Sequence, residues 1–278
     1  MSTALRRQRE IAEREQLLMS IARRLFMERG YLGMNMDQIA EASEYSKGTV
    51  YGHFASKEDL VAAICTDNIR TRGDYFQRAT SFSGRPRERL MAVGISDQIF
   101  VRKHPDHFAT EHVLNIGSVY DRISEQRQNA FFSAKSAAIS PIQAVIEEAV
   151  SRGDLIMPEG QDSCQTMYGL WTQSVGHHAV VAQPKVPPFE QADLDTYLWY
   201  NYQRLLDGYL FRPLSHELDY NESRRRILDE VFPEEQHVLS GVWAGEWPGT
   251  TSGEHQSGEN RPAANQSREA GHEEHHRS

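Results

Sequence analysis

The chain has 278 residues, of which 39% are hydrophobic and 25% are charged, so it is long enough for one large domain or two modest ones. Its formal net charge of −9 argues, taken alone, against a nucleic-acid partner, because phosphates attract basic surfaces. Two cysteines are too few for a disulfide framework, and no apolar run approaches the roughly 18 residues of a membrane span.

The charge is distributed unevenly along the chain. Residues 1–57 carry nine Lys and Arg against seven Asp and Glu, whereas residues 58–278 carry 21 against 32. The acidic balance therefore does not exclude an anionic partner for the N-terminal segment. Because this segment lacks the apolar stretch of a secretory signal, and because Cys65 and Cys164 suit two isolated buried thiols, we expect a cytoplasmic protein.

Apolar residues recur at helical spacing along most of the chain. The first stripe, from Leu17 to Phe26, indicates a helix that Gly30 ends, because glycine tolerates the left-handed conformation. A bend is expected near Pro141, which has no backbone N–H to donate. No alternating pattern is long enough for a sheet, so we predict an all-α fold. The further helices are expected at residues 35–43, 46–54, from Lys57 onward, and at 86–103, 105–115, 119–152, 161–183, 191–211 and 222–232.

Two short helices joined by a tight turn are predicted between residues 35 and 54. Asn35 and Ser46 suit the positions before them, because a side-chain oxygen there can accept a hydrogen bond from a free backbone N–H. Val50 and Phe54, four residues apart, anchor the second helix inward. Its outward side then carries groups that can bond phosphates and base edges, on a helix that fits the major groove. These residues are Lys47, Gly48, Thr49, Tyr51 and His53.

Over about residues 12–65 the sequence resembles the N-terminal domain of the tetracycline-repressor (TetR/AcrR) family. The matching segments are Ile21–Phe26, Glu28–Tyr31, Met36–Ala40, Ser46–Phe54 and Ser56–Leu60. The resemblance implies a three-helix, helix-turn-helix DNA-binding domain followed by a larger helical domain for ligand binding and dimerisation. It also implies a homodimer that binds a palindromic operator in double-stranded DNA and is released by a small-molecule effector.

Carried over position by position, the resemblance assigns eight residues to DNA contact. They are Asn35, Ser46, Lys47, Gly48, Thr49, Tyr51, His53 and Lys57. Two positions depart from the family pattern. Met34 stands where a Thr is usual, so one phosphate-binding hydroxyl is missing, and Glu44 stands where the turn usually has Gly. The second departure predicts either a different turn or backbone strain, with a negative charge near the DNA.

Four segments are expected along the chain. They are a flexible basic arm at residues 1–11, the helix-turn-helix domain at 12–60, a helical regulatory and dimerisation domain at 61–236, and a disordered tail at 237–278. Arg6, Arg7 and Arg9 could reach a minor groove, although a merely solvated terminus fits the nearby glutamates equally well. The tail is poor in aliphatic residues and cannot bury enough surface to offset its ordering entropy.

The larger domain offers candidate residues for an effector pocket and for a dimer interface. The pocket candidates are Ile99, Phe100, Val113, Tyr120, Phe131, Met167 and Trp171, for each of which ordinary core packing is the competing explanation. Apolar faces on the helices at 161–183 and 191–211 suit a four-helix bundle between two subunits. The interface candidates are Trp171, Val175, Leu194, Leu198 and Leu205.

The sequence contains twelve histidines but no metal-ligand spacing, and no catalytic motif. We therefore expect no metal, no cofactor and no enzymatic activity. The prediction is a ligand-responsive transcriptional regulator, a repressor, with an unidentified effector. The alternative is a helical protein that binds a small molecule or a metal and does not bind DNA.

Overall fold

The computed structural model describes residues 3–114, 116–160, 162–183 and 193–239, and across these ranges it contains helices and no strand. The all-α prediction is therefore confirmed. The elements are α1 (Thr3–Gly33), α2 (Met36–Ser43), α3 (Lys47–His53), α4 (Lys57–Thr80), α5 (Pro86–Lys103), α6 (Pro105–Leu114), α7 (Gly117–Tyr120), α8 (Glu125–Arg152), α9 (Ser163–Val181), α10 (Leu194–Gly208), α11 (Tyr220–Val231) and the 3₁₀ helix η1 (Gln236–Leu239).

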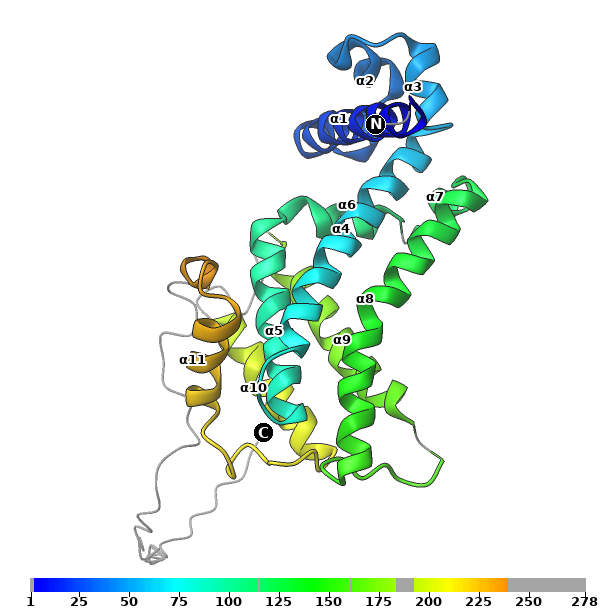
Figure 1. Ribbon diagram of the computed structural model, residues 1–278. Coiled ribbons are helices and arrows are strands. Elements are labelled where there is room, and N and C mark those ends of the chain that lie inside the picture. Colours follow the sequence, from blue (N-terminus) through cyan, green and yellow to red (C-terminus); the bar gives the residue numbers. More distant parts are fainter. Residues whose placement is uncertain (1–2, 115, 161, 184–192, 240–278) are drawn as a thin grey trace, which may run out of the picture.

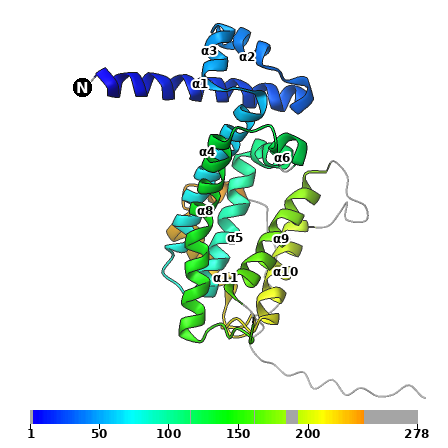
Figure 2. The same cartoon turned by 90° about the vertical axis from the view of Figure 1, so that its right-hand side faces the viewer.

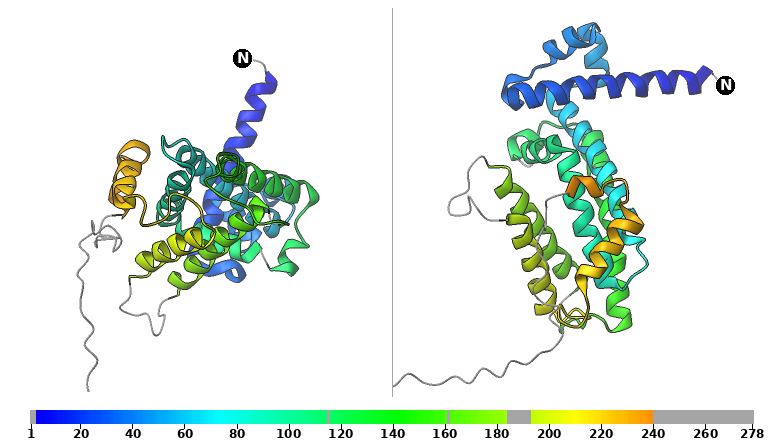
Figure 3. Two further views of the ribbon diagram at one scale, coloured as in Figure 1. Left: turned by 90° about the horizontal axis from the view of Figure 1, so that it is seen from below. Right: turned by 90° about the vertical axis from the view of Figure 1, so that its left-hand side faces the viewer.

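The molecule has a small head of α1–α3 above an elongated helical body (Figure 1). α1 lies across the top of the body, with α2 and α3 on its far side (Figure 2). α4 starts in the head and runs down into the body beside α5 and α8. α9 and α10 lie together along one flank, and α11 covers a different side of the body (Figure 3). Because α4 belongs to both parts, a displacement of the body can reach the head.

The head is held by an apolar core and by the caps of its two short helices. Leu18, Ala22 and Ile39 are buried in one cluster with residues of α3 and α4. Asn35 accepts from the backbone N–H of Gln38 at 2.9 Å, and the Gln38 side chain accepts from the N–H of Asn35 at 3.1 Å. Ser46 similarly caps α3 at 3.1 Å. These caps explain why the predicted starts of the two short helices are confirmed.

Several expected boundaries are wrong. Residues 3–11, expected as part of a flexible arm, continue α1, which the i,i+4 pairs Arg6–Glu10 and Arg9–Glu13 support at 3.0 Å each. Gly30, by contrast, ends the first helical run as predicted, because its φ of +67° and ψ of 174° are not helical, and only a short turn of α1 follows it. The helix expected at 119–152 is divided into α7 and α8, and Pro141 lies inside α8.

Two expectations about the cysteines and the tail also need correction. Cys65 is buried as expected, but Cys164, in the first turn of α9, is exposed. Residues 237–239, assigned to the disordered tail, form part of η1. The remainder of that tail, 240–278, lies outside the described residues. None of the helices in the described ranges is long and apolar enough to cross a membrane.

The seven pocket candidates belong to different parts of the body. Phe131 belongs to the core cluster that also holds the head, whereas Ile99 and Phe100 belong to a second cluster between α4, α5 and α10. Val113 and Met167 pack against different clusters. Tyr120 and Trp171 are exposed. Apolar residues at helical spacing also fill the core of this body, so the spacing alone does not distinguish a pocket wall from a core residue.

A network of buried charges joins the helices of the body. Arg72 of α4 pairs with Asp97 of α5 at 2.5 Å, and Asp97 also accepts from Ser174 and lies 3.1 Å from Nε2 of His178 on α9. Burial alone would raise the pKa of Asp97, but Arg72 and His178 outweigh it and hold that pKa well below its usual range. The network therefore fixes α9 against α5 through ionised groups.

Glu111 of α6 belongs to the same region and makes stability depend on pH. Its carboxylate lies 3.2 Å from His107 and 3.4 Å from Lys135. Burial alone would raise its pKa, but His107, Arg72 and Lys135 together lower the pKa to about 2. The stabilisation is complete above the unfolded-state pKa near 4.5 and is lost as pH falls toward 2.

We expect this residue to contribute about 3 kcal/mol to the decrease in unfolding free energy between pH 5 and pH 2. Urea denaturation at a series of pH values would measure it. The Glu111→Gln variant, which cannot ionise, should show a shallower pH dependence over that range. An identical dependence in both proteins would contradict the assignment.

Candidate nucleic-acid interface

α3 presents a polar outer surface on the head. Val50 and Phe54 are buried beneath it, as predicted. The outward side carries Tyr51, which is 49% exposed, and Lys47, whose side chain is 65% exposed. A phenol and an ammonium four residues apart lie on one side of a helix and can reach bases and phosphates together.

The sequence reasoning missed one feature of α3, the second glycine. A Cβ added at Gly52 would have no atom within 4 Å, and one at Gly48 would meet only Ser46 at 3.8 Å. Packing among the residues that the structure describes therefore requires neither glycine, although each costs about 1 kcal/mol in a helix relative to Ala. Two glycines in a seven-residue exposed helix indicate close approach by an external partner.

Two groups beside Tyr51 are engaged within the head. Lys47 Nζ donates to Asp37 of α2 at 2.7 Å, and this hydrogen bond raises the pKa of Lys47. Its ammonium is therefore charged and already has a carboxylate partner within the head. The hydroxyl of Thr49 lies 2.9 Å from that of Ser46, the residue that caps α3. Asn35 and Ser46 both act first as helix caps, so their DNA contacts remain predictions.

The structure contradicts the expected outward position of His53, and it gives Lys57, an expected phosphate contact, a partner within the head. The His53 side chain is only 11% exposed, with Nδ1 3.8 Å from the carboxylate of Glu15 on α1. Lys57 Nζ donates to the carbonyl of Tyr31 at 3.0 Å and lies 4.0 Å from the centre of its ring. Both residues contact α1, His53 from the last position of α3 and Lys57 from the first position of α4.

Glu44 adopts the left-handed conformation at the end of α2, with φ +59° and ψ +16°. The strain expected for this departure from the family pattern is therefore present, because a side chain disfavours this conformation. The residue is also exposed, so its carboxylate faces solvent beside the turn into α3.

We expect Glu44→Gly to raise the free energy of unfolding by up to about 1 kcal/mol. Glycine relieves the backbone strain, but it also adds conformational freedom to the unfolded chain, which offsets part of the gain. It should also tighten DNA binding by removing a negative charge. The matched variant Glu44→Gln removes the charge but keeps the strain, so it should tighten binding without the gain in stability. Thermal unfolding and DNA titrations of both variants check the two parts separately. Equal stability of the two variants would show that the backbone at Glu44 is not strained.

Two sets of polar contacts tie the head to the body. Arg23 of α1 pairs with Asp106 of α6 at 2.7 Å and with Asp67 of α4 at 2.9 Å. Arg127 of α8 pairs with Glu15 at 3.2 Å and donates to the carbonyl of His53, the last residue of α3, at 3.3 Å. Movements of α6 or α8 therefore act directly on α1 and on the end of α3.

The flank formed by α9 and α10 carries a group of exposed apolar and aromatic side chains. Trp171 is 49% exposed, with its ring 6.2 Å from that of Tyr168. Val175, Val181 and Tyr197 are also exposed. Among the expected interface residues, Trp171 and Val175 lie on this surface. Leu194 and Leu205 are partly covered, whereas Leu198 is buried against α5 within its own chain and cannot contribute.

Residues 18–64 match the family model described as bacterial regulatory proteins, tetR family. An uncharacterized HTH-type transcriptional regulator of Mycobacterium tuberculosis is 29% identical over 143 residues, which is 51% of this chain and 65% of that protein. The HTH-type transcriptional activator FasR of Mycolicibacterium smegmatis is 32% identical over 81 residues, which is 29% of this chain and 37% of FasR. The matches thus span less than two thirds of these relatives.

Solved structures show the same fold at low sequence identity. FadR from Bacillus subtilis, in complex with stearoyl-CoA, superposes with a TM-score of 0.55 at 14% identity, covering 69% of this chain and 98% of FadR. A TetR/AcrR-family regulator from Thermobifida fusca gives 0.53 at 21% identity, covering 71% and 98%. The architecture of a small helical head on a larger helical body is therefore shared.

Proposed function

Because residues 18–64 belong to the tetR family of bacterial regulatory proteins, we propose that the chain is a transcriptional regulator that binds a palindromic operator as a homodimer. The observation that carries the proposal is the outer surface of α3. It places Tyr51 and Lys47 beside two glycines that packing within the chain does not require. A two-fold dimer presents two such helices to successive major grooves.

The exposed aromatic flank of α9 and α10 supports the homodimer. Trp171 and Tyr168 form a contiguous apolar surface with the valines of α9, and such a surface is enriched at protein interfaces. Two helices from each subunit can pack there as a four-helix bundle. We therefore expect two chains on each operator.

We further propose that the protein represses transcription and is released by a small molecule bound in the body. The buried Ile99, Phe100 and Phe131 and the partly buried Val113 and Met167 are its proposed walls. Tyr120 and Trp171 are not proposed as walls of this pocket, because their side chains are exposed. The FadR neighbour holds stearoyl-CoA, but its likeness to this chain is one of fold and does not identify the effector.

The contacts between head and body give the effector a route to the DNA-binding helix. A ligand that displaces α6 or α8 acts on the Arg23–Asp106 pair or on the contact of Arg127 with the end of α3. The ligand must bind one spacing between the two heads of the dimer better than the other. A ligand with equal affinity for both spacings would not change their populations. A hundredfold loss of operator affinity requires about 2.7 kcal/mol of such coupling.

The proposal is tested by selecting bound duplexes from a random DNA pool with the full chain. We expect an enriched palindrome whose half-sites lie about one helical turn apart, or a multiple of it, bound by two chains. Binding should weaken by roughly 10³-fold or more between 50 and 200 mM salt if six phosphates are contacted. Failure to enrich any sequence would overturn the proposal and favour a helical small-molecule binder.

The sign of regulation is tested with a reporter gene placed behind the selected operator. Repression predicts that deletion of the regulator raises transcription. A fall in transcription would instead identify an activator, the activity named for FasR.

A further inference from the structure

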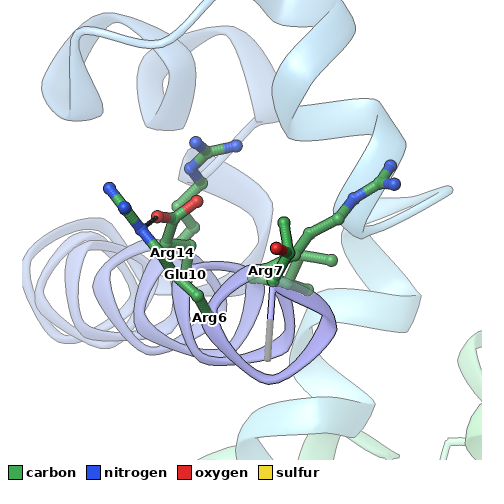
Figure 4. A pocket seen from close by; sticks show the side chains of 6 residues that line it. Arg6, Arg7, Glu10 and Arg14 are labelled. Carbon is green, nitrogen blue, oxygen red and sulfur yellow. Dashed lines mark hydrogen bonds and ion pairs between the residues drawn. The ribbon is translucent and has the colours of Figure 1, made fainter. Parts of the chain in front are cut away.

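The N-terminal half of α1 extends beyond the head into solvent (Figure 2). One side of this extension forms a shallow concave surface, shown with its side chains in Figure 4. The residues that line it recur at intervals of three and four, which places them on one face of the helix. They are Thr3, Arg6, Arg7, Glu10, Ile11 and Arg14.

This face continues the one that packs against α2 and α3. Arg14 precedes the buried Leu18 by four residues, and Arg7 lies a further seven residues, or two turns, toward the N-terminus. The same side of α1 thus changes from apolar to basic where α2 and α3 no longer cover it. Arg14 lies 5.9 Å from the ring of Tyr45, in the turn between α2 and α3. The labelled arginines extend toward the side of the head that carries α2 and α3 (Figure 4).

The pairing of the charges leaves two free cations on this face. Arg6 is paired with Glu10 and Arg9 with Glu13, each at 3.0 Å. Within the part of the chain that the structure describes, Arg7 and Arg14 are paired with no carboxylate, and both are exposed. Their α-carbons are separated by about 10 Å along the helix axis, so they can reach different phosphates of one backbone.

We propose that the N-terminal half of α1 is a second DNA-binding surface, in which Arg7 and Arg14 contact backbone phosphates that flank the bases read by α3. This inference rests on the proposed function. A guanidinium binds phosphate through two parallel hydrogen bonds, which suits it to this contact. Because the extension is already helical, the contact orders less chain than a flexible arm would. The extension thereby lengthens the DNA site without adding sequence specificity.

The test compares the double variant Arg7→Gln/Arg14→Gln with the matched control Arg9→Gln, each in the full chain. Arg9 is two residues from Arg7, about 200° around the helix, and therefore lies on the opposite side of α1. The probe is the duplex selected by the wild-type protein. Circular dichroism confirms that both variants keep the helix content.

We expect the double variant to bind roughly tenfold more weakly or worse at 0.1 M salt. Its plot of log affinity against log salt should be shallower by about 3.6, for two phosphates lost at each of two heads. The control should match the wild type. Trimming the flanks of the duplex should weaken the wild type and leave the double variant unaffected.

Failure of this inference can be distinguished from failure of the proposed function. If the wild type selects no duplex, the proposed function is overturned. If the wild type selects a palindrome and the double variant keeps the same affinity and salt dependence, only the second surface is overturned. If the double variant loses the binding of the wild type to phosphatidylserine vesicles but keeps its affinity for the operator, the second DNA-binding surface is likewise overturned, in favour of a membrane contact.

Discussion

Replacement of Arg87 by Met should lower the free energy of unfolding by about 3–5 kcal/mol. Arg87 lies in the first turn of α5 and its side chain has no exposed area. It pairs with Asp207 at 2.8 Å and donates to the carbonyl of Phe211 at 2.6 Å and to the side chain of Gln203 at 2.5 Å. Met fills a similar volume but removes the donor from the Phe211 carbonyl and the Gln203 side chain, and it leaves Asp207 with hydrogen bonds from Ser215 alone.

The position of these acceptors explains the size of the effect. They belong to α10 and to the segment that follows it, so a single guanidinium fastens this part of the chain to α5. The ring of Tyr220, at the start of α11, also lies 5.2 Å from the guanidinium. Loss of Arg87 therefore loosens two helices at once, and one of them contributes to the proposed dimer surface.

Urea denaturation at fixed protein concentration measures the change, because dimerisation would otherwise alter the apparent stability. The control is Arg225→Met, which removes an arginine from the exposed pair with Glu222 on α11. Exposed pairs contribute little, so this variant should change stability by no more than about 0.5 kcal/mol. A loss below about 1 kcal/mol for Arg87→Met would show that water replaces the guanidinium at its acceptors.

Local features of the fold were predictable from the sequence, because local hydrogen bonds determine them. Asn35 and Ser46 cap α2 and α3 through groups three residues away. The charges of residues 6–13 fit a solvated arm, but their spacing of four also supports the helix that the structure contains. The sequence of this segment is therefore compatible with both a flexible arm and a helix, and only the structure shows that α1 continues through it.

The orientations that depend on distant packing were not predictable. His53 and Lys57 follow a recognition pattern, but their direction is set by α1, more than twenty residues earlier in the chain. Leu198 has the spacing of an interface residue and is buried instead in the core of its own chain. Arg87 and Phe211 are 124 residues apart, and no local pattern connects them.

Replacement of Tyr51 by Ala should weaken binding to the selected operator by about 10²-fold or more, because a base contact contributes about 1–3 kcal/mol and the dimer makes each contact twice. Tyr51 is half-exposed and supports no core packing, so the stability of the variant should stay within about 0.5 kcal/mol of wild type. Fluorescence anisotropy with the labelled duplex measures the affinity. The control is Tyr120→Ala, which removes an exposed tyrosine from α7 in the body.

The same experiment separates Tyr51 from Lys47. Lys47 exchanges an existing partner, Asp37, for a phosphate, so its net gain on binding is smaller than that of a cation with no partner. Lys47→Gln should therefore cost less affinity than Tyr51→Ala, and the loss should shrink as salt rises. The loss from Tyr51→Ala should persist in high salt if the ring and hydroxyl contact bases. An effect of Tyr51 that disappears with salt would instead place it against the phosphate backbone, and the specificity of α3 would then depend on the close approach that Gly48 and Gly52 permit.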